Sequence, residues 1–134
     1  KFYFFDVGIF QTLRPSGPLD SLEEREGAAL ETLVFQELRA QNDYKALGYD
    51  FFCWSLSQGP DVDLVLYGKR GLIALEIKRS SRFRGGELDG LKAFQDQYKM
   101  AKIFFLYGGD EIRQVGEIQI IPVEHFLKNM NGFI

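Results

Sequence analysis

The spacing of apolar residues changes along the chain, and each change marks a different kind of element. Between Ser21 and about Gln41 apolar residues recur every three or four positions, which predicts an amphipathic α-helix. Ser21 is followed three residues later by Glu24, the pattern of a capping box at a helix N-terminus. The expected inner face consists of Leu30, Val34 and Leu38, widened by Leu33 and Phe35.

The next stretch carries shorter apolar runs separated by turn residues. Strands are predicted over Asp50–Leu56, Asp61–Tyr67 and Leu72–Lys78, with short turns at Ser57–Pro60 and Gly68–Gly71. Strict alternation in the second strand would place Val62, Leu64 and Leu66 on one face, and Asp61, Asp63, Val65 and Tyr67 on the other. The third strand is apolar until its end, so we expect it to be buried on both faces.

The remaining segments complete an α/β pattern. A helix over Glu87–Tyr98 precedes a buried strand over Ala101–Tyr107, and Glu117–Ile121 and Val123–Lys128 read as a strand and a short helix. Lys1–Asp6 reads as another strand, and Arg14–Pro18 as a loop. We expect a mixed central sheet with helices on both faces and an αβββαβ core. The first three strands should be antiparallel, and the fourth should be parallel to a neighbour after a right-handed crossover.

Composition and charge narrow the class of protein. The 134 residues, 46% of them hydrophobic, suit a single domain spanning 1–134 with its own core. The net charge of −3 argues against a dedicated, highly basic nucleic-acid binder, but one short stretch is basic: Lys78, Arg79, Arg82 and Arg84. The lone Cys53 lies in an aromatic run and is expected to be buried. No apolar segment approaches membrane-spanning length, and a cytoplasmic location is expected.

The residues with the most chemical content lie at the end of the third predicted strand. Glu76 and Lys78 are two apart, so both project from one face. Folding at Gly68–Gly71 would set Tyr67 opposite Leu72 and Asp63 near Glu76, so that two carboxylates converge beside a lysine. Such a pair suits Mg²⁺ or Mn²⁺, and the lysine could orient or deprotonate a water or neutralise developing phosphate charge. The competing interpretation of Glu76 and Lys78 is a surface ion pair.

Neighbouring charges could serve the same site. Glu31 lies on the flank of the predicted helix stripe and could either reach the metal or extend to water, with Glu37 as the competing helix residue. The basic residues Arg79, Arg82 and Arg84 follow the strand directly and could hold a phosphate backbone, or could form a solvated loop.

These motifs resemble a known superfamily. Pro60-Asp61-Val62-Asp63 followed by Glu76-Ile77-Lys78 resembles the signature of PD-(D/E)XK nucleases, and the segment from Gly27 to Leu38 resembles their first helix. The resemblance implies a restriction-endonuclease-like fold and a magnesium-dependent nuclease acting on nucleic acid, with DNA as the expected substrate. It also implies Asp63, Glu76 and Glu31 as metal ligands and Lys78 as a catalytic residue. Strand parity does not choose between Asp61 and Asp63, whereas the family pattern favours Asp63.

Over nearly its full length the chain is most similar to the uncharacterised C-terminal domain of bacterial and archaeal AAA-family ATPases. The matching residues are Phe2–Gly8, Trp54, Val62–Val65, Glu76–Ser80 and Gly90–Phe94. This resemblance implies that an ATPase domain precedes the segment in the same chain, which begins with Lys1 and carries no phosphate-binding glycine loop. It leaves open a second function, a non-catalytic module that binds nucleic acid or a partner for the ATPase.

Overall fold

The chain folds around one six-stranded sheet. The computed structural model describes residues 3, 6, 8, 9, 12, 17, 21–57 and 59–134. The strand expected over Lys1–Asp6 and the loop expected over Arg14–Pro18 lie outside the described residues, apart from Tyr3, Asp6 and Gly17. In chain order the elements are α2 (Leu22–Tyr44), β1 (Tyr49–Ser55), β2 (Asp61–Gly68), β3 (Gly71–Lys78), the 3₁₀ turn η1 (Gly85–Leu88), α3 (Asp89–Gln97), β4 (Lys102–Tyr107), β5 (Arg113–Val115), β6 (Ile118–Pro122), α4 (Val123–Lys128) and η2 (Met130–Gly132).

The sheet is mixed, with strand order β1-β2-β3-β4-β6-β5. The first three strands form an antiparallel meander, and β4 pairs parallel with β3 after the helical crossover, as the sequence predicts. Strand β6 is parallel to β4, and the short β5, which the sequence analysis did not anticipate, closes the far edge antiparallel to β6. The α/β class and the αβββαβ order are therefore confirmed.

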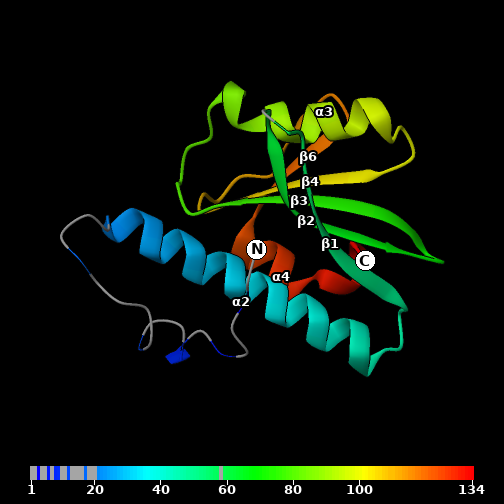
Figure 1. Ribbon diagram of the computed structural model, residues 1–134, viewed down its shortest axis with the longest axis horizontal. Helices are drawn as coiled ribbons and strands as arrows, with labels where there is room; N and C mark the ends of the chain where they lie inside the picture. The colour runs from blue at the N-terminus through cyan, green and yellow to red at the C-terminus, as the bar shows by residue number, and fades with distance from the viewer. Residues whose placement is uncertain are drawn as a thin grey trace.

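Helices cover both faces of this sheet (Figure 1). One core lies under α2 and α4 and joins Val34, Leu38 and Phe126 to inward residues of β2, β3 and β4. The other lies under η1 and α3 and contains Leu88, Leu91 and Phe94. Strand β3 lies between the two cores, and Ile73 to Ile77 are all buried, which confirms that it is enclosed on both sides.

Helix α2 begins as its sequence predicts. The Ser21 hydroxyl accepts from the Glu24 amide, and the Glu24 carboxylate accepts from the Ser21 amide, so the capping box is formed. Val34 and Leu38 are fully buried, but Leu33 is exposed, so the expected widening of the stripe on that side is wrong. No helix in the described part of the chain is long and apolar enough to cross a membrane.

A β-bulge interrupts the alternation of β2. Phe52 pairs with Val65 whereas Trp54 pairs with Val62, so two residues of β2, Asp63 and Leu64, face one of β1. Val62 consequently packs with the core under α3, while Leu64 packs in the opposite core. The expectation that both share one face is therefore wrong at Val62, because a bulge shifts the side-chain parity by one residue.

Strand β1 is the edge of the sheet, and this position corrects the expectation for Cys53. The cysteine is exposed rather than buried. An edge strand has a neighbour on one side only, and three of the four residues from Phe52 to Ser55 are exposed, while Trp54 is half-buried against Phe94 of α3.

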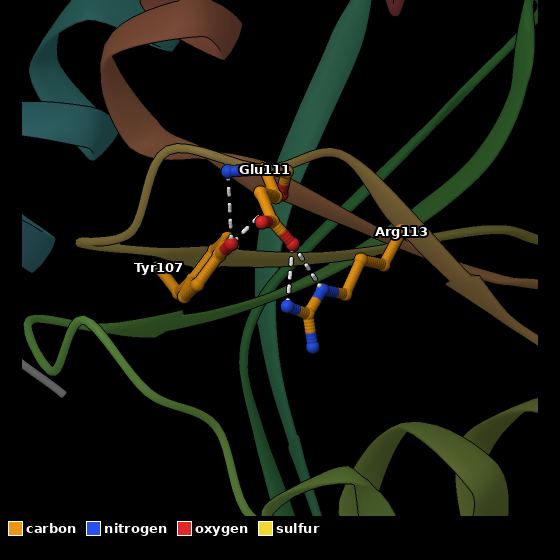
Figure 2. A network of polar contacts seen from close by, with 3 residues as sticks. All are labelled: Tyr107, Glu111 and Arg113. Atoms are coloured by element: carbon orange, nitrogen blue, oxygen red, sulfur yellow. Dashed lines mark hydrogen bonds and ion pairs between the residues drawn. The ribbon is translucent and has the colours of Figure 1, made fainter.

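The connection between β4 and β5 is tied to the end of β4. The Tyr107 hydroxyl donates to the Glu111 carbonyl at 2.7 Å and accepts from the Glu111 amide at 3.2 Å. The Glu111 carboxylate in turn accepts from the Arg113 guanidinium (Figure 2). A Cβ at Gly109 would lie 2.2 Å from the Tyr107 ring, so the loop can close over this ring only with glycine there. Tyr107 pairs with Lys78, so this network supports the strand next to the end of β3.

Candidate active site

Asp63 and Glu76 are the buried acidic residues of the described chain, with 4% and 6% of their surfaces exposed. The β2–β3 register pairs Tyr67 with Leu72 as predicted and ends at Leu64 opposite Leu75, so Asp63 and Glu76 are the next residues of the two strands. Here a side chain, and not a backbone carbonyl, accepts the hydrogen bond of β3: the Ile77 amide donates to Asp63 Oδ2 at 2.9 Å. This hydrogen bond holds one carboxylate against the neighbouring strand, next to the residue that carries the second.

Glu76 is held by one cation and is otherwise enclosed. Its Oε1 lies 2.6 Å from Lys78 Nζ. Its Oε2 is buried with no hydrogen-bond partner. Burial first, and then the negative charge of Asp63, raise the pKa of Glu76 from 4.5 to about 7 against the opposing effect of Lys78. A second cation, or a proton, at this buried oxygen would therefore stabilise the charge of Glu76.

Lys78 is the cation that offsets this charge. Burial lowers the pKa of Lys78, but the hydrogen bond to Glu76 and the charges of Glu76, Asp63 and Glu31 outweigh that effect and raise the pKa overall. The lysine is therefore protonated at neutral pH in this arrangement. Its ion pair is not the surface pair considered above, because the Glu76 side chain is only 8% exposed.

A cleft of about 1080 Å³ opens beside this cluster, between the first turns of α2 and the segment that follows β3. Glu31 lines the cleft from α2 and is half-buried, and its charge acts on Lys78. Glu37 is exposed and is not part of the lining. Of the two candidates on the helix, the structure thus brings Glu31 and not Glu37 to the cleft.

The two aspartates of the motif also differ. Asp61 is exposed at the start of β2, whereas Asp63 is buried. Among the charges that raise the pKa of Glu76, Asp63 has the larger influence and Asp61 the smaller. The geometry therefore favours Asp63 as the partner of Glu76, a choice that strand parity did not allow.

The basic residues predicted for phosphate contact all line the cleft, but their surroundings differ. Arg79 is bound to α2 through a 2.7 Å ion pair between its guanidinium and Glu26. Arg82 and Arg84 are exposed, and no ion pair with another described residue involves them. A phosphate in the cleft would meet Arg82 and Arg84 directly and would compete with Glu26 for Arg79.

Part of the cleft was not identified from the sequence. Glu23, Gly27 and Glu31 line it from successive turns of α2, and Glu26 makes the contact with Arg79. The four-residue spacing from Glu31 back to Gly27 and Glu23 was the available signal, since residues so spaced share one helix face. Apart from its chain neighbours and its own helix backbone, a Cβ at Gly27 would have no other atom within 4 Å, so the cleft is open at this position of the helix.

The donor set suits a hard divalent cation in part. Two converging carboxylates, one with an unpartnered buried oxygen, match the one or two carboxylates that Mg²⁺ takes from a protein. Across the residues described, no group of three or more His, Cys, Asp or Glu side chains is placed to hold a metal ion. Asp63 and Glu76 would therefore be the protein ligands, with water and substrate oxygens completing the shell, and Glu31 would act from farther away.

Comparison with known proteins identifies a family. No curated protein matches the chain. A family model described as a domain of unknown function, DUF4143, matches residues 26–126, a span that includes Glu31, Asp63, Glu76 and Lys78. Domains of this family are often the C-terminal domains of AAA-type ATPases. Because the match covers well over half of its residues, the chain belongs to the DUF4143 family.

Proposed function

We propose that this domain hydrolyses phosphodiester bonds of nucleic acid, with DNA as the expected substrate, in a reaction that requires Mg²⁺ or Mn²⁺. The single observation that carries the proposal is the buried Asp63–Glu76 pair, joined to Lys78 beside a cleft lined by Arg79, Arg82 and Arg84. Two carboxylates held together in the protein interior are unfavourable by themselves, and a divalent cation relieves the cost. This arrangement is also what the resemblance to PD-(D/E)XK nucleases implies.

Each residue then has a defined part. Asp63 and Glu76 would hold the metal, which supplies Lewis acidity and lowers the pKa of a bound water. Lys78 would orient the attacking water and neutralise charge on the phosphate in the transition state. Glu31 lines the same cleft as Lys78 and would help to position that water. Arg82 and Arg84 would hold the phosphate backbone, and Arg79 would join them when released from Glu26.

The direct test is cleavage of end-labelled DNA by the purified domain with Mn²⁺ and with EDTA. The wild type should cleave with Mn²⁺ only, and Asp63→Asn and Lys78→Met should each lower the rate by 100-fold or more, as expected for loss of a metal ligand or a charge-stabilising group. Glu37→Gln is the matched control, since Glu37 is exposed and does not line the cleft. Cleavage that is unchanged in both site variants would assign the activity elsewhere.

A second function is favoured by a different observation. Three carboxylates do not form a metal-binding group among the described residues, and the family is often joined to ATPases. The domain would then be a non-catalytic module of a cytoplasmic ATPase that binds nucleic acid or another subunit. Calorimetric titration with Mn²⁺ separates the two: binding that is lost in Glu76→Gln supports the enzyme, and no binding to the wild type supports the module.

A further inference from the structure

A second concave surface lies at the other end of the sheet from the cleft, and none of the proposed catalytic residues forms it. It has a volume of about 570 Å³ and lies between the first strands and the end of α3. We call it the aromatic groove and define it by Phe52, Trp54, Tyr67, Tyr98 and Met100, which line it. In Figure 1 the end of α3 and the β2–β3 turn lie at the right, whereas the first turns of α2 lie at the left.

The composition of this groove is unusual for a protein surface. Phe52 and Tyr67 are 50% and 60% exposed, and Met100 is 78% exposed. Trp54 is half-buried, with its ring edge-on to Phe94 at 5.4 Å between centroids. Partly exposed planar rings that share one concavity can stack with other planar groups.

Three basic residues lie close in sequence to residues that line the groove. Lys69 and Arg70 occupy the turn between Tyr67 and Gly71, which both line the groove, and Lys99 lies between Tyr98 and Met100. Lys69 and Arg70 are exposed and make no ion pair with another described residue, while Lys99 pairs with Asp96. Asp50 lies opposite Tyr67 in the register, so two acids, Asp50 and Asp96, stand against the three cations Lys69, Arg70 and Lys99.

We propose that the aromatic groove binds unpaired bases of single-stranded nucleic acid, with the rings stacking on the bases and Lys69 and Arg70 contacting the phosphates. Exposed rings in a concavity with cations at its edge are the combination by which proteins hold single strands without reading their sequence. The choice of ligand rests on the proposed function, and it specifies that the substrate carries a single-stranded segment. From Leu72 at the groove to Lys78 at the cleft, β3 advances by six residues, or about 20 Å.

A single tryptophan makes the proposal measurable without catalysis. Trp54 is the only tryptophan of the chain, and it lines the groove. Titration with oligodeoxythymidine in EDTA at low salt should quench its fluorescence saturably, and added salt should weaken the binding. Tyr98→Ala should weaken binding about tenfold or more, and Lys69→Ala combined with Arg70→Ala should lower the salt dependence. Tyr44→Ala is the matched control, since Tyr44 is 88% exposed and is not among the residues that line the groove.

The outcomes distinguish this inference from the proposed nuclease. Lys78→Met should remove cleavage and leave quenching by the oligonucleotide unchanged. Cleavage that persists in a wild type showing no saturable quenching would overturn the groove proposal alone. Equal binding by the wild type and Tyr98→Ala would overturn it as well. A third outcome is self-association: the Trp54 fluorescence and the apparent molecular mass of the protein would then change with protein concentration in the wild type but not in Tyr98→Ala. That result would assign the groove to a second copy of the chain and not to nucleic acid.

Discussion

Replacing Glu76 by glutamine removes one titrating group and keeps the shape of the side chain. In the wild type the pKa of Glu76 is raised to about 7 by burial and by the charge of Asp63. The folded state therefore holds this proton more tightly than the unfolded chain, whose carboxyl titrates near 4.5. Between these two values the folded state carries more protons than the unfolded state, so the free energy of unfolding falls as pH rises.

The size of the effect follows from the same two values. At about 1.4 kcal/mol per unit of pKa difference, ionising Glu76 in the fold costs roughly 3 kcal/mol by pH 8. Glutamine does not titrate, so Glu76→Gln should lack this loss. Relative to the wild type, the variant should gain roughly 2.5 kcal/mol between pH 5 and pH 8, because part of the loss has already occurred in the wild type below pH 5.

Urea denaturation in EDTA at half-unit steps of pH measures this difference. Glu117→Gln is the control, because Glu117 is exposed in the turn between β5 and β6. The free energy of unfolding of this variant should follow that of the wild type at every pH. If the free energies of unfolding of the wild type and Glu76→Gln change in parallel from pH 5 to pH 8, then the fold does not raise the pKa of Glu76. The electrostatic argument for a cation at this position would fail with it.

Three other results can be predicted from the geometry. At pH 8, Mn²⁺ at 100 times its dissociation constant should stabilise the wild type by about 3 kcal/mol and leave the stability of Glu76→Gln unchanged. Thermal unfolding with and without the ion measures this difference. Equal shifts of the unfolding temperature in both proteins would place the ion elsewhere. Gly90→Ala should destabilise the domain by about 1–3 kcal/mol, because a Cβ there would lie 2.0 Å from the Asp61 carbonyl oxygen. Gly27→Ala, with open space around its Cβ, should instead stabilise the domain by about 0.5–1 kcal/mol in the same denaturation assay. A destabilised Gly27→Ala would contradict the argument that glycine in a helix costs conformational entropy at this position.

The order of elements could be predicted because each segment has a single strong period. The four-residue spacing in α2, the apolar run of β3 and the turn residues at Gly68 to Gly71 each agree with one structure only. The β2–β3 register was predictable for the same reason, because a short turn fixes which residues face each other.

The errors arose where a long-range contact decides the outcome. Cys53 has the neighbours of a core residue in the sequence, but its strand lies at the sheet edge, and strand order is not written in the local pattern. The short β5 is entirely exposed and has no apolar run, so only its pairing with β6 makes it a strand. Val62 changes cores because of a bulge, and a bulge leaves no composition signal at Asp63 and Leu64.

The bulge also helps to explain why Asp63, and not Asp61, is the carboxylate buried beside Glu76. A regular β2 would continue the backbone ladder to β3 beyond Leu64, and the Ile77 amide would need no side-chain acceptor. With the ladder interrupted, Asp63 Oδ2 takes that amide, which fixes the carboxylate in the interior within electrostatic reach of Glu76 and Lys78. Asp61 lies beyond the interruption, exposed at the start of the strand, and makes no comparable contact with β3 among the described residues. Bulges often lie beside active sites because they redirect one side chain while the strands on either side stay paired. The position of the first carboxylate is therefore set by the backbone irregularity, and that of the second by the regular pairing of Glu76 with Phe105 of β4.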